Sequence, residues 1–178
     1  MSDDDLRHLA VRLARGDESA FAELYDACAD SLYAFVAARL GDREAASDVV
    51  QAAFLRAVKS RKRFRQVENP AAYLFQIARN EISRALAKRG RVVSGSLSPA
   101  DLYLPAKESS PSVDDAEAAA VALARLDADT REVVELKLYA GLTFREIAEV
   151  TGRPQGSVAT RYRRALASLR EWLTRATR

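Results

Sequence analysis

Apolar residues recur at helical spacing near the start of the chain. Phe21, Leu24, Cys28, Leu32 and Phe35 follow one another at intervals of three or four positions, which is the period of one face of an α-helix. The alternation of apolar and polar residues that marks a β-strand extends over no comparable length. The pattern predicts an all-α protein.

Residues with capping preferences divide the first half of the chain into separate helices. Asp17 or Ser19 can cap the helix that carries these apolar positions, and Leu40-Gly41-Asp42 combines a stop with a new N-cap. Asn69-Pro70 is an N-cap followed by a proline suited to a first turn, and it predicts a long helix that ends near Arg89-Gly90.

The segment between these caps predicts one more helix and a loop. We expect the helix to cover about residues 43–59, with Val50, Phe54 and Val58 as a buried stripe. The polar and basic stretch over residues 60–68 is predicted to be a loop.

Composition changes after residue 90. Residues 91–112 hold most of the prolines and many serines, and such a stretch cannot bury enough apolar surface to order itself. A helical pattern resumes from Asp114. The sequence therefore predicts a helical domain over residues 1–90, a flexible linker over 91–112 and a smaller helical domain over 113–178.

Residues 141–172 contain two predicted helices separated by a tight turn. Thr143 and Glu146 form a capping box for the first helix, Gly152 makes the turn, and Pro154 suits the first turn of the second. This layout is typical of a DNA-binding helix-turn-helix, whose second helix enters the major groove. An ordinary helical hairpin with a solvated basic face is the alternative. The outer face of the second helix carries Gln155, Ser157, Thr160, Arg161, Arg163 and Arg164.

The net charge is only +3, but the charges are sorted along the chain. Basic residues dominate residues 56–91, where the acidic residues are Glu68 and Glu81, and they dominate again from Arg153 onward. Two basic blocks separated by acidic segments indicate two places that contact nucleic-acid phosphates. Two solvated basic helix faces remain the simpler reading of either block alone.

Candidate catalytic chemistry is sparse. His8 is the lone histidine, Cys28 is the lone cysteine, and neither a glycine-rich phosphate loop nor a His/Cys cluster is present. We therefore expect no catalytic residues, no metal and no cofactor. No apolar run approaches the roughly 20 residues that span a bilayer, and the acidic N-terminus is unlike a signal peptide. These features predict a cytoplasmic protein without membrane insertion.

Asp48 and Gln51 lie three positions apart with Leu55 one turn further, so the three share a helix face. A solvated face needs no function. A polar pair beside an exposed leucine is, however, also what a surface for docking another protein would show.

Several motifs in order resemble those of an extracytoplasmic-function (group 4) sigma factor, over about residues 21–173. They are Asp48-Val49-Val50-Gln51, residues 73–80 (Tyr-Leu-Phe-Gln-Ile-Ala-Arg-Asn), residues 136–148 and residues 156–165. The resemblance implies a sigma-2 domain and a sigma-4 domain joined by a linker. It also implies a function: binding core RNA polymerase and directing it to promoters, where the DNA is melted.

The resemblance implies roles for specific residues. Asp48, Gln51 and Leu55 would dock on the clamp coiled coil of the polymerase largest subunit. The linker would be threaded through the polymerase. Residues expected to bind the single-stranded minus-10 element are Lys62, Arg63, Phe64, Arg65, Asn69, Tyr73, Gln76, Arg79 and Asn80. Residues expected to bind the duplex minus-35 element are Arg153, Gln155, Ser157, Thr160, Arg161, Arg163 and Arg164.

The chain departs from the family pattern at three places. Tyr73-Leu74 replaces the usual Trp-Leu and keeps an aromatic ring for stacking, and Leu126-Asp127 replaces the usual Leu-Pro with a residue that can cap a helix. Ala159 stands where the recognition helix usually carries a basic residue, so promoter specificity does not carry over from other members.

Two other functions remain open at this point. One is a stand-alone helix-turn-helix regulator that never engages polymerase, although a basic loop and the Asp48/Gln51 helix would be unusual in its first domain. The other is an adaptor that binds polymerase or an anti-sigma factor without melting promoters. For a sigma factor, an anti-sigma factor is a further expected partner.

Overall fold

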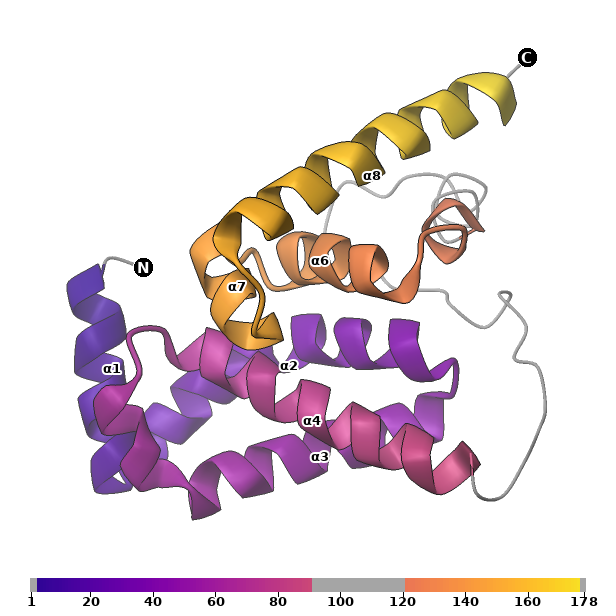
Figure 1. Ribbon diagram of the computed structural model, residues 1–178. Coiled ribbons are helices and arrows are strands. Elements are labelled where there is room, and N and C mark those ends of the chain that lie inside the picture. The colour runs from indigo at the N-terminus through magenta and orange to yellow at the C-terminus, as the bar shows by residue number, and fades with distance from the viewer. Residues whose placement is uncertain (1–2, 91–120, 177–178) are drawn as a thin grey trace. The chain divides into compact units, whose positions relative to one another are not determined.

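The computed structural model describes residues 3–90 and 121–176, and within these residues every regular element is a helix (Figure 1). The chain divides into two compact units, Met1–Ser94 and Gly95–Arg178. The all-α, two-domain architecture is therefore confirmed. The predicted linker over residues 91–112 lies outside the described residues.

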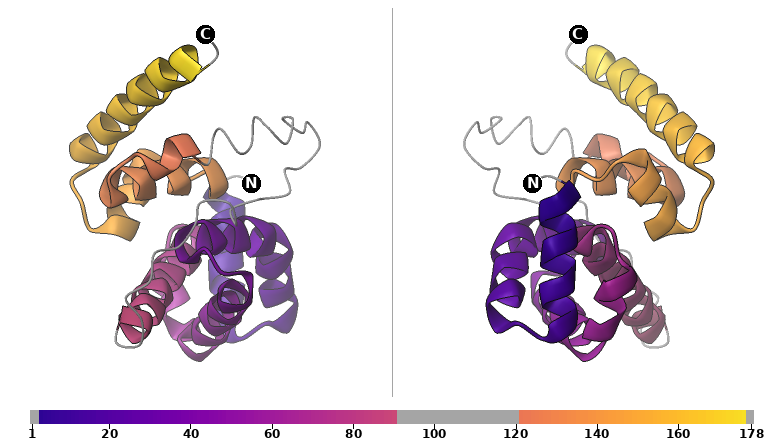
Figure 2. Two further views of the ribbon diagram at one scale, coloured as in Figure 1. Left: turned by 90° about the vertical axis from the view of Figure 1, so that its right-hand side faces the viewer. Right: turned by 90° about the vertical axis from the view of Figure 1, so that its left-hand side faces the viewer.

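The N-terminal unit is built on a bundle in which α2, α3 and α4 pack against one another. At one end of this bundle, α1 packs against the short 3₁₀ helix η1 (Figures 1 and 2). The elements are α1 (Asp3–Arg15), α2 (Glu18–Leu40), α3 (Arg43–Lys59), η1 (Arg61–Gln66) and α4 (Pro70–Gly90).

The predicted caps form these helix ends. The Asp17 carboxylate accepts hydrogen bonds from the backbone N–H groups of residues 19 and 20 at the start of α2. Gly41 ends α2 in the left-handed conformation with φ 61°, and Asp42 then caps α3. The Asn69 side-chain oxygen accepts from Ala71 and Ala72 at the start of α4.

Two expectations about α3 and the segment after it are wrong. The residues of α3 that face the bundle core are small or β-branched: Ala46, Val49, Ala53 and Ala57. Val58 of the expected stripe is 42% exposed, because the bundle packs on the neighbouring row of small residues, which lies one position earlier along the helix. The expected loop contains η1, whose Phe64 is fully buried.

The C-terminal unit contains α6 (Ala128–Tyr139), α7 (Phe144–Thr151) and α8 (Gln155–Ala176), all three in mutual contact. Its core includes Val133, Leu136, Ile147, Val158 and Ala165.

The helix ends of this unit follow the predicted chemistry. Asp127 caps α6 through Thr130 N, and Thr143 and Glu146 form the predicted capping box of α7. Gly152 makes the turn with φ 70°, and α8 begins at Gln155, directly after Pro154. The helix-turn-helix therefore has the predicted geometry.

Candidate nucleic-acid and protein interfaces

One face of α3 combines polar and apolar exposure. Asp48 and Gln51 are exposed, and Leu55 is 54% exposed. Gln51 and Leu55 line a groove of about 550 Å³ between α2 and α3, whose apolar lining includes Tyr25 and Phe54 with ring centroids 4.9 Å apart. Two of the three side chains predicted to bind another protein thus line this groove, and Asp48 lies outside it.

The basic residues of η1 are exposed, while its aromatic residue points inward. The four exposed basic residues are Arg61, Lys62, Arg63 and Arg65. The Phe64 ring makes edge-to-face contacts with Phe21 at 6.1 Å and with Tyr73 at 5.2 Å between centroids. Phe64 was expected on the DNA-binding surface, but its fully buried ring belongs to the core and cannot stack on a base in this conformation.

Residues of α4 continue this basic surface. Tyr73 is half-buried, and its hydroxyl lies 3.4 Å from Ser60 Oγ. Gln76 and Arg79 are partly exposed and Asn80 is fully exposed. Tyr73, Gln76 and Asn80 share one helix face by their spacing. Asn69, in contrast, uses its amide oxygen to cap α4.

Sequence reasoning missed how Glu81 acts within the basic block. Its carboxylate lies 2.6 Å from Arg56 Nε on α3 and 2.6 Å from Arg84 Nη1 on α4. The Glu81 side chain is only 12% exposed. Its pair with Arg84 follows from i,i+3 spacing, but its pair with Arg56 depends on how α3 and α4 pack. These two arginines are thereby partly neutralised.

Helix α8, the second helix of the helix-turn-helix, carries polar residues that face solvent and one arginine that faces α6. Gln155, Ser157, Arg163 and Arg164 are exposed. Arg161 is partly buried, with Nη1 3.4 Å from Thr130 Oγ1 and 3.6 Å from Asp127 Oδ1 of the α6 N-terminus. Four of these side chains are therefore open to solvent, whereas Arg161 contacts the start of α6.

Arg153, like Arg161, pairs with an acid at the start of α6. Its Nη2 lies 2.6 Å from Asp129 Oδ1, and its side chain is only 25% exposed. The first turn of α6 therefore pairs both with the turn before α8, through Arg153, and with the second turn of α8, through Arg161. Thr160 and Arg161, with Arg164, also line a cavity of about 610 Å³ beside Asp127.

Hydrogen bonds shift the pKa of Asp127, and burial shifts the pKa of Cys28. The pKa of Asp127 is lowered, first by the hydrogen bonds from the Thr130 side chain and backbone and to a smaller extent by the charge of Arg161. Burial raises the pKa of the Cys28 thiol to about 11, so this residue is an inert part of the core at neutral pH.

Metal sites and membrane-spanning helices are absent from the part of the chain that the structure describes. Among residues 3–90 and 121–176, His, Cys, Asp and Glu side chains do not gather in a group of three or more that could hold a metal ion. None of the helices in these ranges is long and apolar enough to cross a membrane.

Comparison with known proteins identifies both units. The sigma-70 region 2 family matches residues 24–92, and the sigma-70 region 4 family matches residues 116–169. The ECF RNA polymerase sigma factor BldN of Streptomyces coelicolor is 30% identical over 92% of this chain, which spans 64% of that relative, just under two thirds. The ECF RNA polymerase sigma factor SigL of Mycobacterium tuberculosis is 33% identical over 88% of this chain and 90% of its own length.

Solved structures agree with these matches. The sigma factor RpoE of Bartonella quintana, solved with the anti-sigma factor NepR, is 29% identical with a TM-score of 0.66, covering 80% of this chain and 89% of its own. CnrH, solved with the cytosolic domain of CnrY, is 25% identical with a TM-score of 0.67, covering 95% and 97% of the two chains.

Proposed function

Because this chain belongs to the sigma-70 family of RNA polymerase sigma factors, we propose that it is an extracytoplasmic-function (group 4) member acting in the cytoplasm. In this proposal it binds core RNA polymerase, directs it to promoters and melts the DNA, as a transcription factor rather than an enzyme. One observation carries the proposal: each family region holds an exposed basic element, η1 with α4 in region 2 and α8 in region 4.

The surface of η1 and α4 suits capture of an unpaired strand at the minus-10 element. Lys62, Arg63 and Arg65 neutralise phosphates, while the side-chain amides of Gln76 and Asn80 can bond to the exposed edges of bases. Tyr73 offers the exposed part of its ring for stacking on a base. Phe64 contributes by supporting Tyr73 from the core.

The surface of α8 suits reading of duplex DNA at the minus-35 element. Gln155 and Ser157 lie in the first turn, where side chains of a recognition helix reach base edges. Arg163 and Arg164 lie further along and bind phosphates, which positions the helix without reading sequence. Thr160 and Arg161 border the base-reading residues, and Arg153 holds the turn against α6.

The exposed face of α3 suits binding of a helical partner. Asp48 and Gln51 provide polar contacts and Leu55 an apolar anchor, as in other interfaces where a few residues dominate. We propose core RNA polymerase as this partner. Because RpoE was solved with an anti-sigma factor, we also propose that an anti-sigma factor regulates this chain by covering sigma-factor surfaces.

Reconstitution with core polymerase tests the function. Transcripts from a genomic template should start downstream of two spaced elements shared by many promoters. Duplex binding without polymerase binding would instead indicate a stand-alone regulator, and polymerase binding without melting would indicate an adaptor.

A double variant tests the docking face. Asp48→Arg with Gln51→Ala should lose core polymerase in a pull-down while keeping its circular-dichroism spectrum, because both side chains are exposed. Asp26→Arg is the matched control, since Asp26 is an exposed acid on α2 that does not line the groove. Wild-type polymerase binding by the double variant would contradict the assignment.

A further inference from the structure

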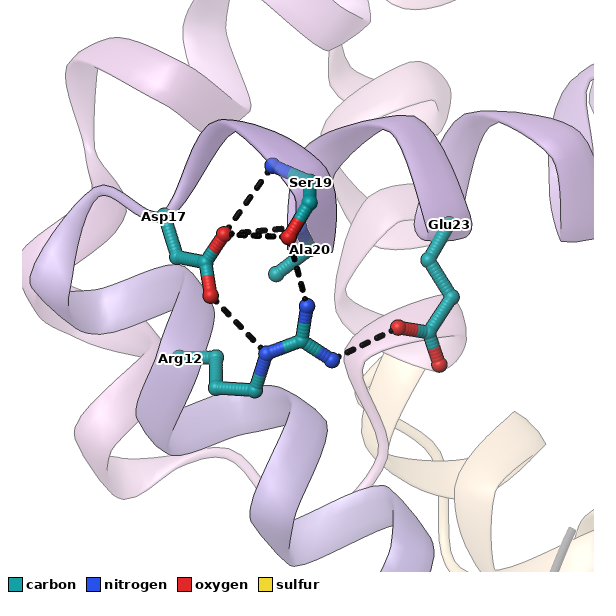
Figure 3. Close-up of polar contacts among 5 residues, drawn as sticks. All are labelled: Arg12, Asp17, Ser19, Ala20 and Glu23. Atoms are coloured by element: carbon teal, nitrogen blue, oxygen red, sulfur yellow. Dashed lines mark hydrogen bonds and ion pairs between the residues drawn. The ribbon is translucent and has the colours of Figure 1, made fainter.

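The α1 helix and the turn after it lie before residue 24, where the family match begins. A hydrogen-bonded network joins the end of α1 to the start of α2 (Figure 3). Arg12 donates to Asp17 Oδ2 at 2.9 Å, to Glu23 Oε2 at 2.8 Å and to Ser19 Oγ at 2.9 Å. The same Asp17 caps α2, so one guanidinium holds α1 to the helix cap and to the next turn of α2.

Two groups in this network, Arg12 and Asp17, are stabilised in their charged forms. The pKa of Asp17 is held well below its usual range, first by the Ser19 hydroxyl and then by Arg12. The pKa of Arg12 is raised, first by its hydrogen bond with Asp17 and then by that with Glu23. The pair of Arg12 and the α2 cap Asp17 therefore stays charged throughout the physiological pH range.

The turn held by this network lies against η1. Gly16 has φ 83°, a left-handed conformation that favours glycine. A Cβ atom at Gly16 would lie 3.1 Å from Arg61 Nε and 3.3 Å from Arg61 Cδ, so the first side chain of η1 rests on the glycine backbone. The α1 helix also buries Leu9 and Leu13, and it packs closely against η1.

The η1 segment needs such support to keep its shape. It is a 3₁₀ helix of six residues without a side-chain N-cap hydrogen bond, and 3₁₀ runs longer than three or four residues are uncommon because their hydrogen-bond geometry is poor. On its inner side, Phe64 packs between Phe21 and Tyr73. Its first residue is supported by the turn after α1.

We propose that α1 positions η1 for capture of the melted strand, with Arg12 and Gly16 as the positioning residues. By keeping η1 ordered before DNA arrives, α1 presents Lys62, Arg63 and Arg65 in a fixed arrangement, so less conformational entropy is lost on binding. This inference rests on the proposed function, because it assigns α1 to the melting step. Polymerase docking uses the separate face around Asp48.

Two variants of the full chain disturb the support in different ways. Arg12→Ala removes the network, whereas Gly16→Ala keeps the network but strains the backbone and displaces Arg61. Arg15→Ala is the matched control, because Arg15 is an exposed arginine of the same helix outside the network. Circular dichroism and core polymerase binding report whether the rest of the unit is intact.

Two further measurements test the positioning role itself. Trypsin should cut free protein at Lys62, Arg63 or Arg65 faster in both variants than in the wild type or Arg15→Ala. With polymerase, both variants should form open complexes about tenfold less well by permanganate footprinting, since several side chains must then be ordered during capture. Polymerase affinity should stay at the wild-type value.

The outcomes separate this inference from the proposed function. Wild-type cleavage rates and wild-type melting in both variants would overturn the positioning role. Loss of polymerase binding in both would also overturn it, because α1 would then support the whole unit. If the wild-type holoenzyme itself melts no promoter, the proposed function fails, whereas the trypsin comparison still decides whether α1 holds η1.

Discussion

Replacing Asp127 by Asn should strengthen binding to the duplex minus-35 element. Asp127 Oδ1 lies 3.6 Å from Arg161 Nη1, and in the proposed complex its carboxylate would compete with DNA phosphates for this guanidinium. Asn is as good an N-cap as Asp, so the hydrogen bond from Thr130 N persists and α6 stays capped. The substitution therefore removes the charge without removing the helix end.

The gain in DNA affinity is set by how exposed the Asp127–Arg161 ion pair is. The side chains of Asp127 and Arg161 are 66% and 36% exposed, and an exposed ion pair contributes about 0.2–1 kcal/mol. Releasing Arg161 therefore tightens DNA binding by up to about fivefold, since 1.4 kcal/mol is tenfold in affinity. The free energy of unfolding should change by less than about 1 kcal/mol. Asp127→Ala, which also loses the cap, should cost about 0.5–2 kcal/mol.

Fluorescence anisotropy with a selected minus-35 duplex, measured over a series of salt concentrations, checks this prediction. Because Arg161 becomes able to neutralise a phosphate, the slope of log affinity against log salt should steepen by up to about one unit. In an Arg161→Ala background the gain from Asp127→Asn should vanish, as a double-mutant cycle requires. Unchanged or weaker binding by Asp127→Asn, or a gain that persists without Arg161, would refute this reasoning.

Three further predictions concern stability and reactivity. Phe64→Ala should lower the free energy of unfolding by about 3–5 kcal/mol in urea titrations, because the ring is fully buried, and a loss below about 1 kcal/mol would contradict its place in the core. Cys28 should react with iodoacetamide at pH 8 far more slowly in folded than in urea-unfolded protein. Burial raises the pKa of Cys28 from its ordinary value of 9.0 to about 11, so its burial stabilises the protein below pH 9, and this contribution is lost as pH rises toward 11. Asp42→Ala should lower the free energy of unfolding by about 0.5–2 kcal/mol, because it removes the α3 cap. It also removes the carboxylate partner of Arg89. A thermal unfolding curve that matches the wild type would exclude this role of Asp42.

Helix ends and the exposure of the Asp48 face of α3 were predictable because both depend on nearby residues. Asp17, Asp42, Asn69 and Thr143 each cap a helix through backbone groups two or three positions away, so the sequence alone contains the whole interaction. The exposure of Asp48 likewise follows from helical spacing.

The buried face of α3 was decided by tertiary packing. Val50, Phe54 and Val58 have the spacing of a core stripe, but the bundle packs on a row that includes Ala46, Ala53 and Ala57. Small side chains allow helix backbones to approach closely. A hydrophobicity pattern, however, ranks these small residues below larger apolar ones as core candidates.

The partners of the basic residues were also decided only by the tertiary structure. Arg12, Arg56, Arg153 and Arg161 each pair with an acid that belongs to another helix or to its N-cap, and Phe64 lies in the core although its neighbours in sequence are charged. The sequence by itself determined most of the longer helices, their caps and the two basic regions. Which side chains of those regions stay exposed depended on which helices meet, because Coulomb attraction and burial act through space and not along the chain.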